Sequence, residues 1–187
     1  ILSELVRRRG QVVEMLTAER NRRSTCPISL SDTLEEHIAW LTAERDRLTA
    51  QIKTMLASQP EFNDKDVVLQ SVKGVGPIFS ATLQAELPEL GIYSHKQIAA
   101  LVGVAPFNKD SGSFRGKRRI KGGRSGVRST LYLATLSAIQ HNLVIKAHYQ
   151  QLIDRGKLRM VAVVACMRKL IVILNAMVRD MRTWQPQ

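Results

Sequence analysis

Aromatic residues are scarce in this sequence: Phe, Trp and Tyr together make up 5% of its 187 residues. Proteins that hold single-stranded nucleic acid by stacking its bases need exposed aromatic side chains, so the scarcity argues against that class. Long hydrophobic runs are also missing, because no stretch of about 18 consecutive apolar residues occurs. The most apolar stretch, residues 160–178, is interrupted by Arg168 and Lys169 and predicts a buried helix.

Cysteine is almost absent. Cys26 and Cys166 lie far apart and match no metal-ligand spacing, and this usage fits a reducing, cytoplasmic setting. Cys166 falls in the apolar stretch, so we expect a small core residue rather than a reactive thiol. We expect no cofactor in this chain, and we interpret its four histidines as structural or surface residues: His37, His95, His141 and His148.

No secretory signal peptide is recognisable, and the chain begins at Ile1 rather than at Met. We therefore expect it to begin inside a longer protein. Its length suits one well-formed core, or a smaller domain joined to an extended helical piece.

Acidic residues are few in the second part of the chain. Residues 71–187 contain 18 Lys and Arg but only 5 Asp and Glu, whereas residues 1–70 contain 10 and 11. The whole net charge of +12 therefore comes from the second part. Such an excess indicates a polyanionic partner, and nucleic acid is the first choice. The alternative, charge that merely aids solubility, predicts interspersed signs instead.

Residues 1–60 are predicted to form an arm of two helices. A breaker at 24–31 separates a helix over 1–23 from a second helix that begins with a capping signal at Asp32 and Glu35. Apolar residues repeat with heptad spacing, which is typical of an antiparallel coiled-coil hairpin and indicates an oligomer contact or a rigid arm. The expected seam residues are Leu2, Leu5, Val12, Leu16, Leu34, Ile38, Leu41, Leu48, Ile52 and Met55.

Residues 61–187 are predicted to form a compact helical domain after a polar boundary at 58–66. Ser94 and Gln97 form a capping box, and Gly156 suits a helix C-terminus. The segment 107–120 has glycine punctuation and no helical period, so it predicts a basic loop or a short β-hairpin. The fold class is therefore all-α. The expected helices cover 64–72, 77–87, 95–103, 125–142, 145–155 and 158–183.

The turn at residues 73–77 resembles a helix-hairpin-helix. Gly74 and Gly76 permit a tight turn between two helices, and Pro77 suits the first helical position. Free amides at the start of the second helix can then bind a phosphate oxygen, and Lys73 stands beside them. Such contacts hold DNA without reading its sequence. The alternative is a plain helical corner with a glycine-rich bend.

A second motif, residues 109–128, is strongly basic. No acid interrupts its cations from Arg115 onward, and its glycines keep the backbone thin, so the segment can lie against a phosphate chain. The alternative is a disordered basic tail, which the apolar anchors Phe114 and Ile120 argue against. The cations are Arg115, Lys117, Arg118, Arg119, Lys121, Arg124 and Arg128.

Ser111, Gly112 and Ser113 stand just before these cations. A serine hydroxyl is a weak nucleophile that needs activation, and arginines can stabilise both an alkoxide and the charge of a phosphoryl transition state. Ser111 is also a common type of turn residue, which is the alternative. The sequence indicates no Ser-His-Asp arrangement and no acidic cluster for Mg²⁺ in 71–187.

Three stretches together resemble a known family. They are GVGPIFSATLQAEL (74–87), LVGVAPFNKDSG (101–112) and FRGKRRIKGGRSGVRSTLYLATL (114–136). In this order they look like the C-terminal transposase domain of the DEDD-type insertion-sequence transposases. That family includes the Piv invertase and the bridge-RNA-guided serine recombinases. The resemblance covers about 70–160 closely, and the arm resembles the family's coiled-coil insertion.

The resemblance implies roles for individual residues. Ser111 corresponds to the family's nucleophile, which forms a phosphoserine link to DNA, with Gly112 as its partner and Ser113 as the less favoured candidate. The sequence departs from the family's K-x-G-N turn, because Lys121 is followed by two glycines and then by Arg124. Family members also carry a RuvC-like domain whose DEDD carboxylates bind Mg²⁺. Nothing similar occurs in 1–187, so the resemblance implies that Mg²⁺ is held outside this chain.

The sequence therefore predicts the DNA-binding, nucleophile-bearing part of a transposase or site-specific recombinase. Expected partners are double-stranded DNA, a guide RNA and further copies of the chain joined through the arm, but no membrane. Two alternatives stay open: a non-catalytic helix-hairpin-helix module that binds DNA, and an RNA-binding protein. The expected nucleic-acid-binding residues are Lys73, Gly74, Gly76, Gly112, Arg115, Lys117, Arg118, Arg119, Lys121, Arg124 and Arg128, with Ser111 as the catalytic residue.

Overall fold

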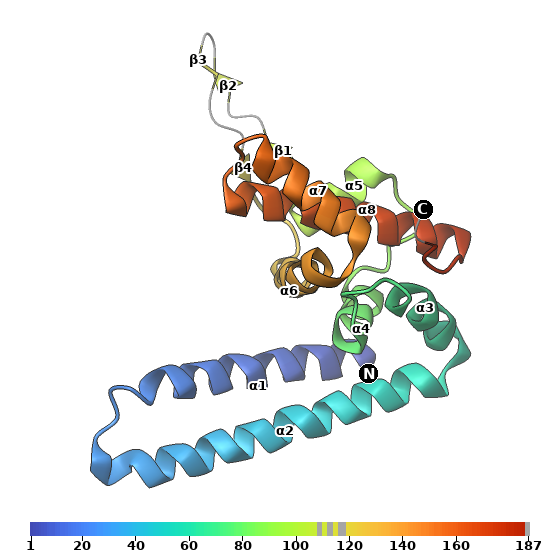
Figure 1. Ribbon diagram of the computed structural model, residues 1–187. Coiled ribbons are helices and arrows are strands. Elements are labelled where there is room, and N and C mark those ends of the chain that lie inside the picture. The colour runs from blue at the N-terminus through green and yellow to red at the C-terminus, as the bar shows by residue number, and fades with distance from the viewer. Residues whose placement is uncertain (108–109, 112–113, 116–118, 186–187) are drawn as a thin grey trace. The chain divides into compact units, whose positions relative to one another are not determined.

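The computed structural model describes residues 1–107, 110–111, 114–115 and 119–185, and the side chains of 107–119 lie outside this description. Within the described ranges the fold consists of eight α-helices, a 3₁₀ turn and four strands of two residues each (Figure 1). The predicted all-α class is confirmed. The chain divides into two compact units, Ile1–Phe62 and Asn63–Gln187.

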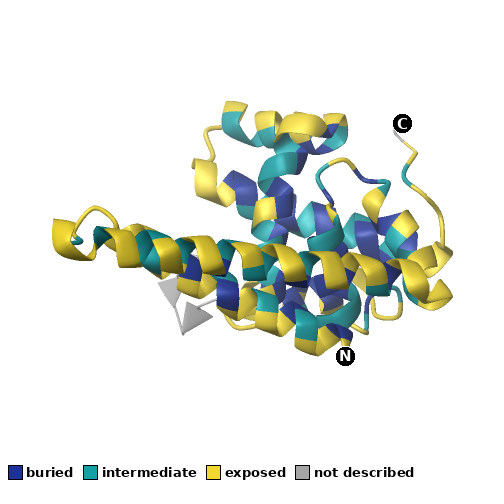
Figure 2. Cartoon of the chain, turned by 90° about the horizontal axis from the view of Figure 1, so that it is seen from below, coloured by how far each residue is buried: buried dark blue, intermediate teal, exposed yellow. Residues whose placement is uncertain are grey.

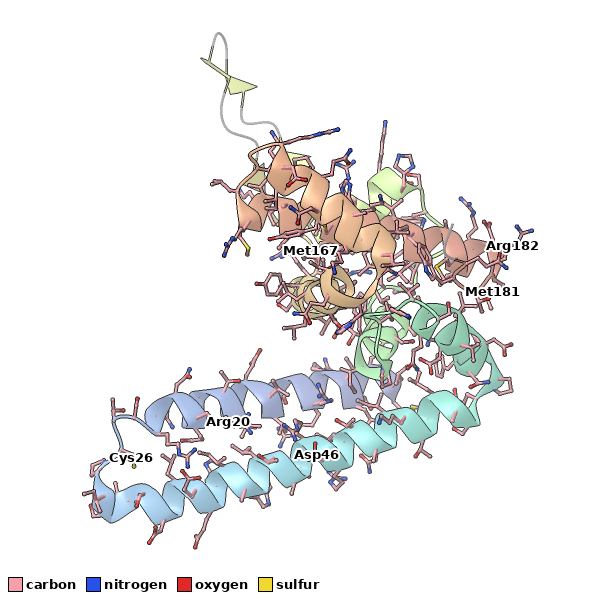
Figure 3. The ribbon with its side chains drawn as sticks, viewed as in Figure 1. Arg20, Cys26, Asp46, Met167, Met181 and Arg182 are labelled. Atoms are coloured by element: carbon pink, nitrogen blue, oxygen red, sulfur yellow. The ribbon has the colours of Figure 1, made fainter. Side chains whose placement is uncertain are left out.

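The first unit is an arm of two long helices. Helix α1 (Leu2–Arg22) and helix α2 (Ser31–Ser58) lie side by side in opposite directions, joined through the 3₁₀ turn η1 (Ile28–Leu30) (Figure 1). Cys26 lies in this connection at the end of the arm (Figure 3). The seam buries a cluster of four apolar residues, Val12, Leu16, Leu41 and Leu48.

Three details of the arm differ from the sequence prediction. Helix α2 begins at Ser31 without any side-chain cap, because the preceding turn η1 leads directly into it, so the predicted cap at Asp32 is wrong. Val6 is buried in α1 besides the predicted residues, and Leu56 rather than Met55 is buried in α2, whereas Leu5 packs partly buried against the seam cluster as predicted. A strict heptad drifts around a straight helix, so the buried position moves by one residue near the ends.

A polar contact crosses the seam in its middle. Arg9 of α1 donates from Nε to Oγ1 of Thr49 of α2 at 2.8 Å. Burial lowers the pKa of the Arg9 guanidinium from its ordinary value, and the nearby charge of Arg45 lowers it further. This contact occupies the place where Arg45 interrupts the apolar repeat, and it fixes the register of the two helices.

The second unit is built around one apolar helix. Helix α8 (Arg159–Asp180) packs against α5 (His95–Val102), α6 (Ser125–His141) and α7 (Leu143–Asp154), and α4 (Pro77–Glu86) packs against α6. By length and composition α8 could cross a membrane, but the core helix of a globular domain passes the same test, and 56% of its apolar window is buried inside the protein. The predicted buried helix is confirmed, because ten residues of α8 are buried. Figure 2 colours the buried residues of the chain dark blue.

Helix boundaries follow local chemistry closely. The capping box at Ser94 and Gln97 is confirmed, with each residue bonding the other's backbone amide. Helix α3 (Pro60–Gln70) begins four residues before the predicted 64, because Pro60 fits the first helical position as well as Pro77 does. The sequence analysis missed the side chain of Asn142, which accepts hydrogen bonds from the first amides of α7.

Cys166 is a core residue, as predicted. It is fully buried on α8, and burial raises the pKa of its thiol to about 11. A thiol with such a pKa is almost entirely protonated at neutral pH and is therefore unreactive.

Candidate nucleic-acid interface

The basic segment forms a narrow β-ribbon between α5 and α6. Strand β1 (Pro106–Phe107) pairs antiparallel with β4 (Arg119–Ile120). Strands β2 (Asp110–Ser111) and β3 (Phe114–Arg115), which lie between β1 and β4 in the sequence, pair antiparallel with each other. Ser111 lies opposite Phe114 in this inner pair. The inner pair lies beyond β1 and β4, away from the helices (Figure 1). The backbone of the predicted nucleophile therefore stands near the outer end of a projecting element.

The base of the ribbon is closed by a contact between glycines. Gly103 ends α5 in the left-handed conformation at φ 76°, and Gly123 precedes α6 at φ 75°. A methyl group built on Gly123 would lie 2.6 Å from the Cα atom of Gly103, which no real side chain tolerates. The two backbones can approach this closely only because both residues lack a Cβ atom. We call Gly103 and Gly123 the glycine clasp.

Two hydrogen bonds reinforce the clasp. The backbone amide of Arg124 donates to the carbonyl oxygen of Leu101 at 2.8 Å. The guanidinium of Arg128, one turn into α6, donates to the carbonyl oxygen of Gly122. The ribbon is thus anchored at both ends to α5 and α6.

Arg124 anchors the same region to the end of α4. Its guanidinium forms a bidentate pair with the carboxylate of Glu89, with both N–O distances 2.6 Å, and also donates to the backbone oxygen of Glu86 at 2.8 Å. The hydrogen bonds from Arg124 hold the pKa of Glu89 below its ordinary value, and Glu89 raises the pKa of Arg124 in turn. Because its donors are engaged internally, a phosphate contact from Arg124 would compete with this pair.

Glu89→Gln should therefore weaken the second unit by about 1 kcal/mol, because the pair is bidentate yet partly exposed. A carboxyl whose pKa is depressed by folding contributes stability above its unfolded pKa of about 4.3 and loses it as the pH falls further. Denaturant unfolding at pH 7 and at pH 3.5 checks this, since the difference in stability between the variant and the unsubstituted chain should be smaller at pH 3.5. The exposed pair of Asp180 with Arg179 supplies the control, because Asp180→Asn should change little. A pH-independent loss would contradict the assignment.

The turn between α3 and α4 also depends on glycine. Gly74 has φ 105°, and a Cβ atom there would lie 2.6 Å from the backbone nitrogen of Ala138 in α6. Gly76 is the N-cap residue of α4, and nothing stands within 4 Å of its missing side chain. Pro77 holds the first helical position as predicted, and Lys73 is exposed. Two helices thus flank a glycine turn, while phosphate binding at that turn stays a prediction.

Gly74→Ala should cost about 3 kcal/mol of folding free energy, because the new methyl group meets a helix backbone and the residue also has a positive φ. Gly156→Ala is the matched control: Gly156 has φ 74° but open space around it. That variant should lose only about 1 kcal/mol from backbone strain. Denaturant unfolding compares the two, and equal losses would show that the contact with α6 contributes nothing.

The structure brings together only part of the predicted site. Gly112, Lys117 and Arg118 lie outside the described residues, and Arg115 and Arg119 are described by their backbone alone. The other predicted binding residues differ in how exposed they are. Lys73, Gly76 and Lys121 are exposed, whereas Gly74, Arg124 and Arg128 are half-buried and make structural contacts.

An apolar groove beside the ribbon was not predicted. It has a volume of about 530 Å³ and is lined by Pro106 and Ile120 at the base of the ribbon and by Met160, Val161 and Arg168 of α8, among others. Ile120 is 36% exposed and Met160 57% exposed. The first turns of α8 therefore stand next to the basic segment.

The described residues do not fit a metal site. Within the described ranges, no group of three or more His, Cys, Asp or Glu side chains is placed to hold a metal ion.

An all-helical domain with a glycine-clasped, cationic ribbon defines a candidate nucleic-acid-binding domain. Residues 66–150 match the sequence model of the IS116/IS110/IS902 transposase family. The predicted resemblance is confirmed. The matched range includes the glycine turn, the ribbon and Ser111.

Similar proteins agree with this assignment. The pilin gene-inverting proteins of Moraxella bovis and Moraxella lacunata are each 26% identical to the chain over 97% of its length. A 43.6 kDa protein of insertion element IS110 from Streptomyces coelicolor is 28% identical over 73% of the chain. The chain spans 58% of each pilin gene-inverting protein and 33% of the insertion-element protein.

Proposed function

We propose that this chain is the DNA-binding, nucleophile-bearing part of a transposase or site-specific recombinase that breaks and rejoins DNA through a phosphoserine intermediate. The observation that carries the proposal is the family match over residues 66–150, which includes the serine-bearing ribbon. The names of the relatives point the same way, because they describe gene inversion and insertion elements.

Ser111 is the proposed nucleophile. Its Oγ atom forms a bond to the phosphorus of a DNA phosphodiester, the bond from phosphorus to one sugar oxygen breaks, and that oxygen leaves with a proton. The reverse attack by a sugar hydroxyl restores the serine and joins the strands. The cations that follow in the chain stabilise the charge that develops on the phosphoryl oxygens.

DNA binding is assigned to two elements. The ribbon contributes Arg115, Lys117, Arg118, Arg119 and Lys121, which neutralise phosphates without reading bases. The turn at 73–76 contributes Lys73 and the first amides of α4, a helix whose N-terminus attracts anions.

Further components lie outside these residues in the proposal. Mg²⁺ is held by a RuvC-like domain of the parent protein, because no described group in this chain fits a metal. The arm joins copies of the chain, since exchanging two strands requires two active sites. A guide RNA is a further proposed partner.

A plasmid assay tests the division of labour. The chain alone should shift duplex DNA in a gel but should not nick supercoiled plasmid, whereas the parent protein should do both on its own target. Efficient nicking by the chain alone would contradict the proposal, and so would failure to bind duplex DNA at low salt.

The rival function is a non-catalytic helix-hairpin-helix module that binds DNA or RNA. The glycine turn favours it, because that element alone is sufficient for backbone binding. Competition at fixed salt between a DNA duplex and a structured RNA separates the two nucleic acids. A module without chemistry would form no covalent link to DNA in any variant of the parent protein.

A further inference from the structure

The corner formed by α7 and α8 carries a concentration of cations that the proposed function does not use. Residues 143–169 contain six Lys or Arg and a single acid, Asp154. Asp154 accepts a hydrogen bond from Gln150 at 2.7 Å. Within the described ranges, no salt bridge neutralises any of the six cations, which are Lys146, Arg155, Lys157, Arg159, Arg168 and Lys169.

These cations gather because of helix geometry. Arg155 is the C-cap residue of α7 and follows His148 by seven residues, which is about two helical turns. Lys169 comes from α8, which packs against α7. Lys157 lies in the exposed connection between the two helices, and Arg159 is the exposed first residue of α8. Arg155 and Lys169 lie close enough to His148 for their charges to act on it.

The effect on His148 shows that the charges act on one another. Burial lowers the pKa of His148 from its ordinary value, and the charges of Lys169 and Arg155 lower it further. Helix α6 also packs against α7, and its titratable groups are Arg128, Tyr132 and His141. Burial and these cations together therefore favour the neutral imidazole at pH 7, and an anion placed among the cations would favour its protonated form.

We propose that the α7–α8 corner, comprising His148, Arg155, Lys157, Arg159 and Lys169, is a second binding surface for the phosphate backbone of duplex DNA. The inference deepens the proposed function and rests on it for the choice of DNA. Arg168, the neighbour of Lys169 in α8, lines the apolar groove that also contains Ile120 at the base of the ribbon, so α8 extends from the corner to the ribbon.

The chemistry of the corner suits a duplex rather than a single strand. Its one aromatic residue, Tyr149, is partly buried and packs against the core, so it offers no stacking platform. Phosphates spaced regularly along a duplex suit cations carried on rigid helices.

The test measures how DNA affinity depends on salt for the full chain. The double variant Arg155→Gln and Lys169→Gln should reduce the slope of log K against log salt by about 2, close to one unit per lost phosphate contact. A matched control, Lys53→Gln with Lys96→Gln, removes two exposed charges elsewhere and should leave the slope unchanged. The variant Lys121→Gln measures separately how much the ribbon contributes to this slope.

Proton linkage gives an independent readout. Bound phosphate favours protonated His148, so affinity for duplex DNA should rise as the pH falls from 7.5 to 5.5. This rise should be about fivefold larger in the unsubstituted chain than in His148→Gln, which is within the tenfold that a shift of one pKa unit allows. Circular dichroism establishes that each variant is folded.

The outcomes separate the two proposals. This inference is overturned, and the proposed function is left standing, if only Lys121→Gln lowers the slope. In that case the corner variant (Arg155→Gln with Lys169→Gln) and His148→Gln both behave like the unsubstituted chain. If the unsubstituted chain does not bind duplex DNA at low salt, both this inference and the proposed function are overturned. Loss of affinity for a structured RNA but not for the DNA duplex in the corner variant also overturns the choice of DNA.

Discussion

Gly123→Ala should lower the free energy of unfolding of residues 63–187 by about 4 kcal/mol. The new Cβ atom would overlap Gly103 at its nitrogen and Cα atoms and also approach the carbonyl carbon of Val102 at 2.7 Å. All three neighbours belong to the backbone, so no side chain can move aside. The residue also has φ 75°, which strains any L-residue with a side chain.

Gly122→Ala is the control for this experiment. Gly122 has almost the same conformation, φ 72°, but nothing stands within 4 Å of its missing side chain. Its substitution should cost about 1–2 kcal/mol from backbone strain alone. Denaturant unfolding measures both variants. If Gly123→Ala is no worse than Gly122→Ala, the glycine clasp does not hold the base of the ribbon.

Ser111→Ala in the parent protein should reduce strand cleavage at least about 10³-fold while leaving duplex affinity within about twofold, because the change removes only the attacking oxygen. Ser113→Ala is the matched control, and it should keep most of the activity. Cleavage of a target plasmid and a gel-shift titration measure the two quantities. Equal losses of cleavage and affinity in Ser111→Ala would indicate a binding role, and full activity would exclude Ser111 as the nucleophile.

Much of the helical fold could be predicted because its signals are local. The capping box at Ser94 lies within one helical turn, and the proline at the start of α4 acts on its own helix. The same rule applied to Pro60 would have placed the start of α3 correctly. Burial at Leu56 instead of Met55 depends on where the partner helix lies, which a repeat pattern indicates only approximately.

The arrangement around the ribbon could be predicted less well. The cations and glycines of the basic segment are visible in the sequence, but the pairing of Gly103 with Gly123 joins segments on either side of the ribbon. Arg124 was expected to bind phosphate, because a cation among cations looks free in a sequence. Its bidentate partner Glu89 comes from the connection after α4, and only the folded chain brings the two together.

The covalent step tests the central claim most directly. The parent protein is incubated with a target duplex carrying a nick that prevents rejoining, the protein–DNA adduct is isolated under denaturing conditions, and the modified peptide is identified by mass spectrometry after nuclease digestion. The account predicts a phosphodiester on Oγ of Ser111 in the peptide that spans the ribbon. An adduct on any other residue, or an adduct that persists in Ser111→Ala, would contradict it.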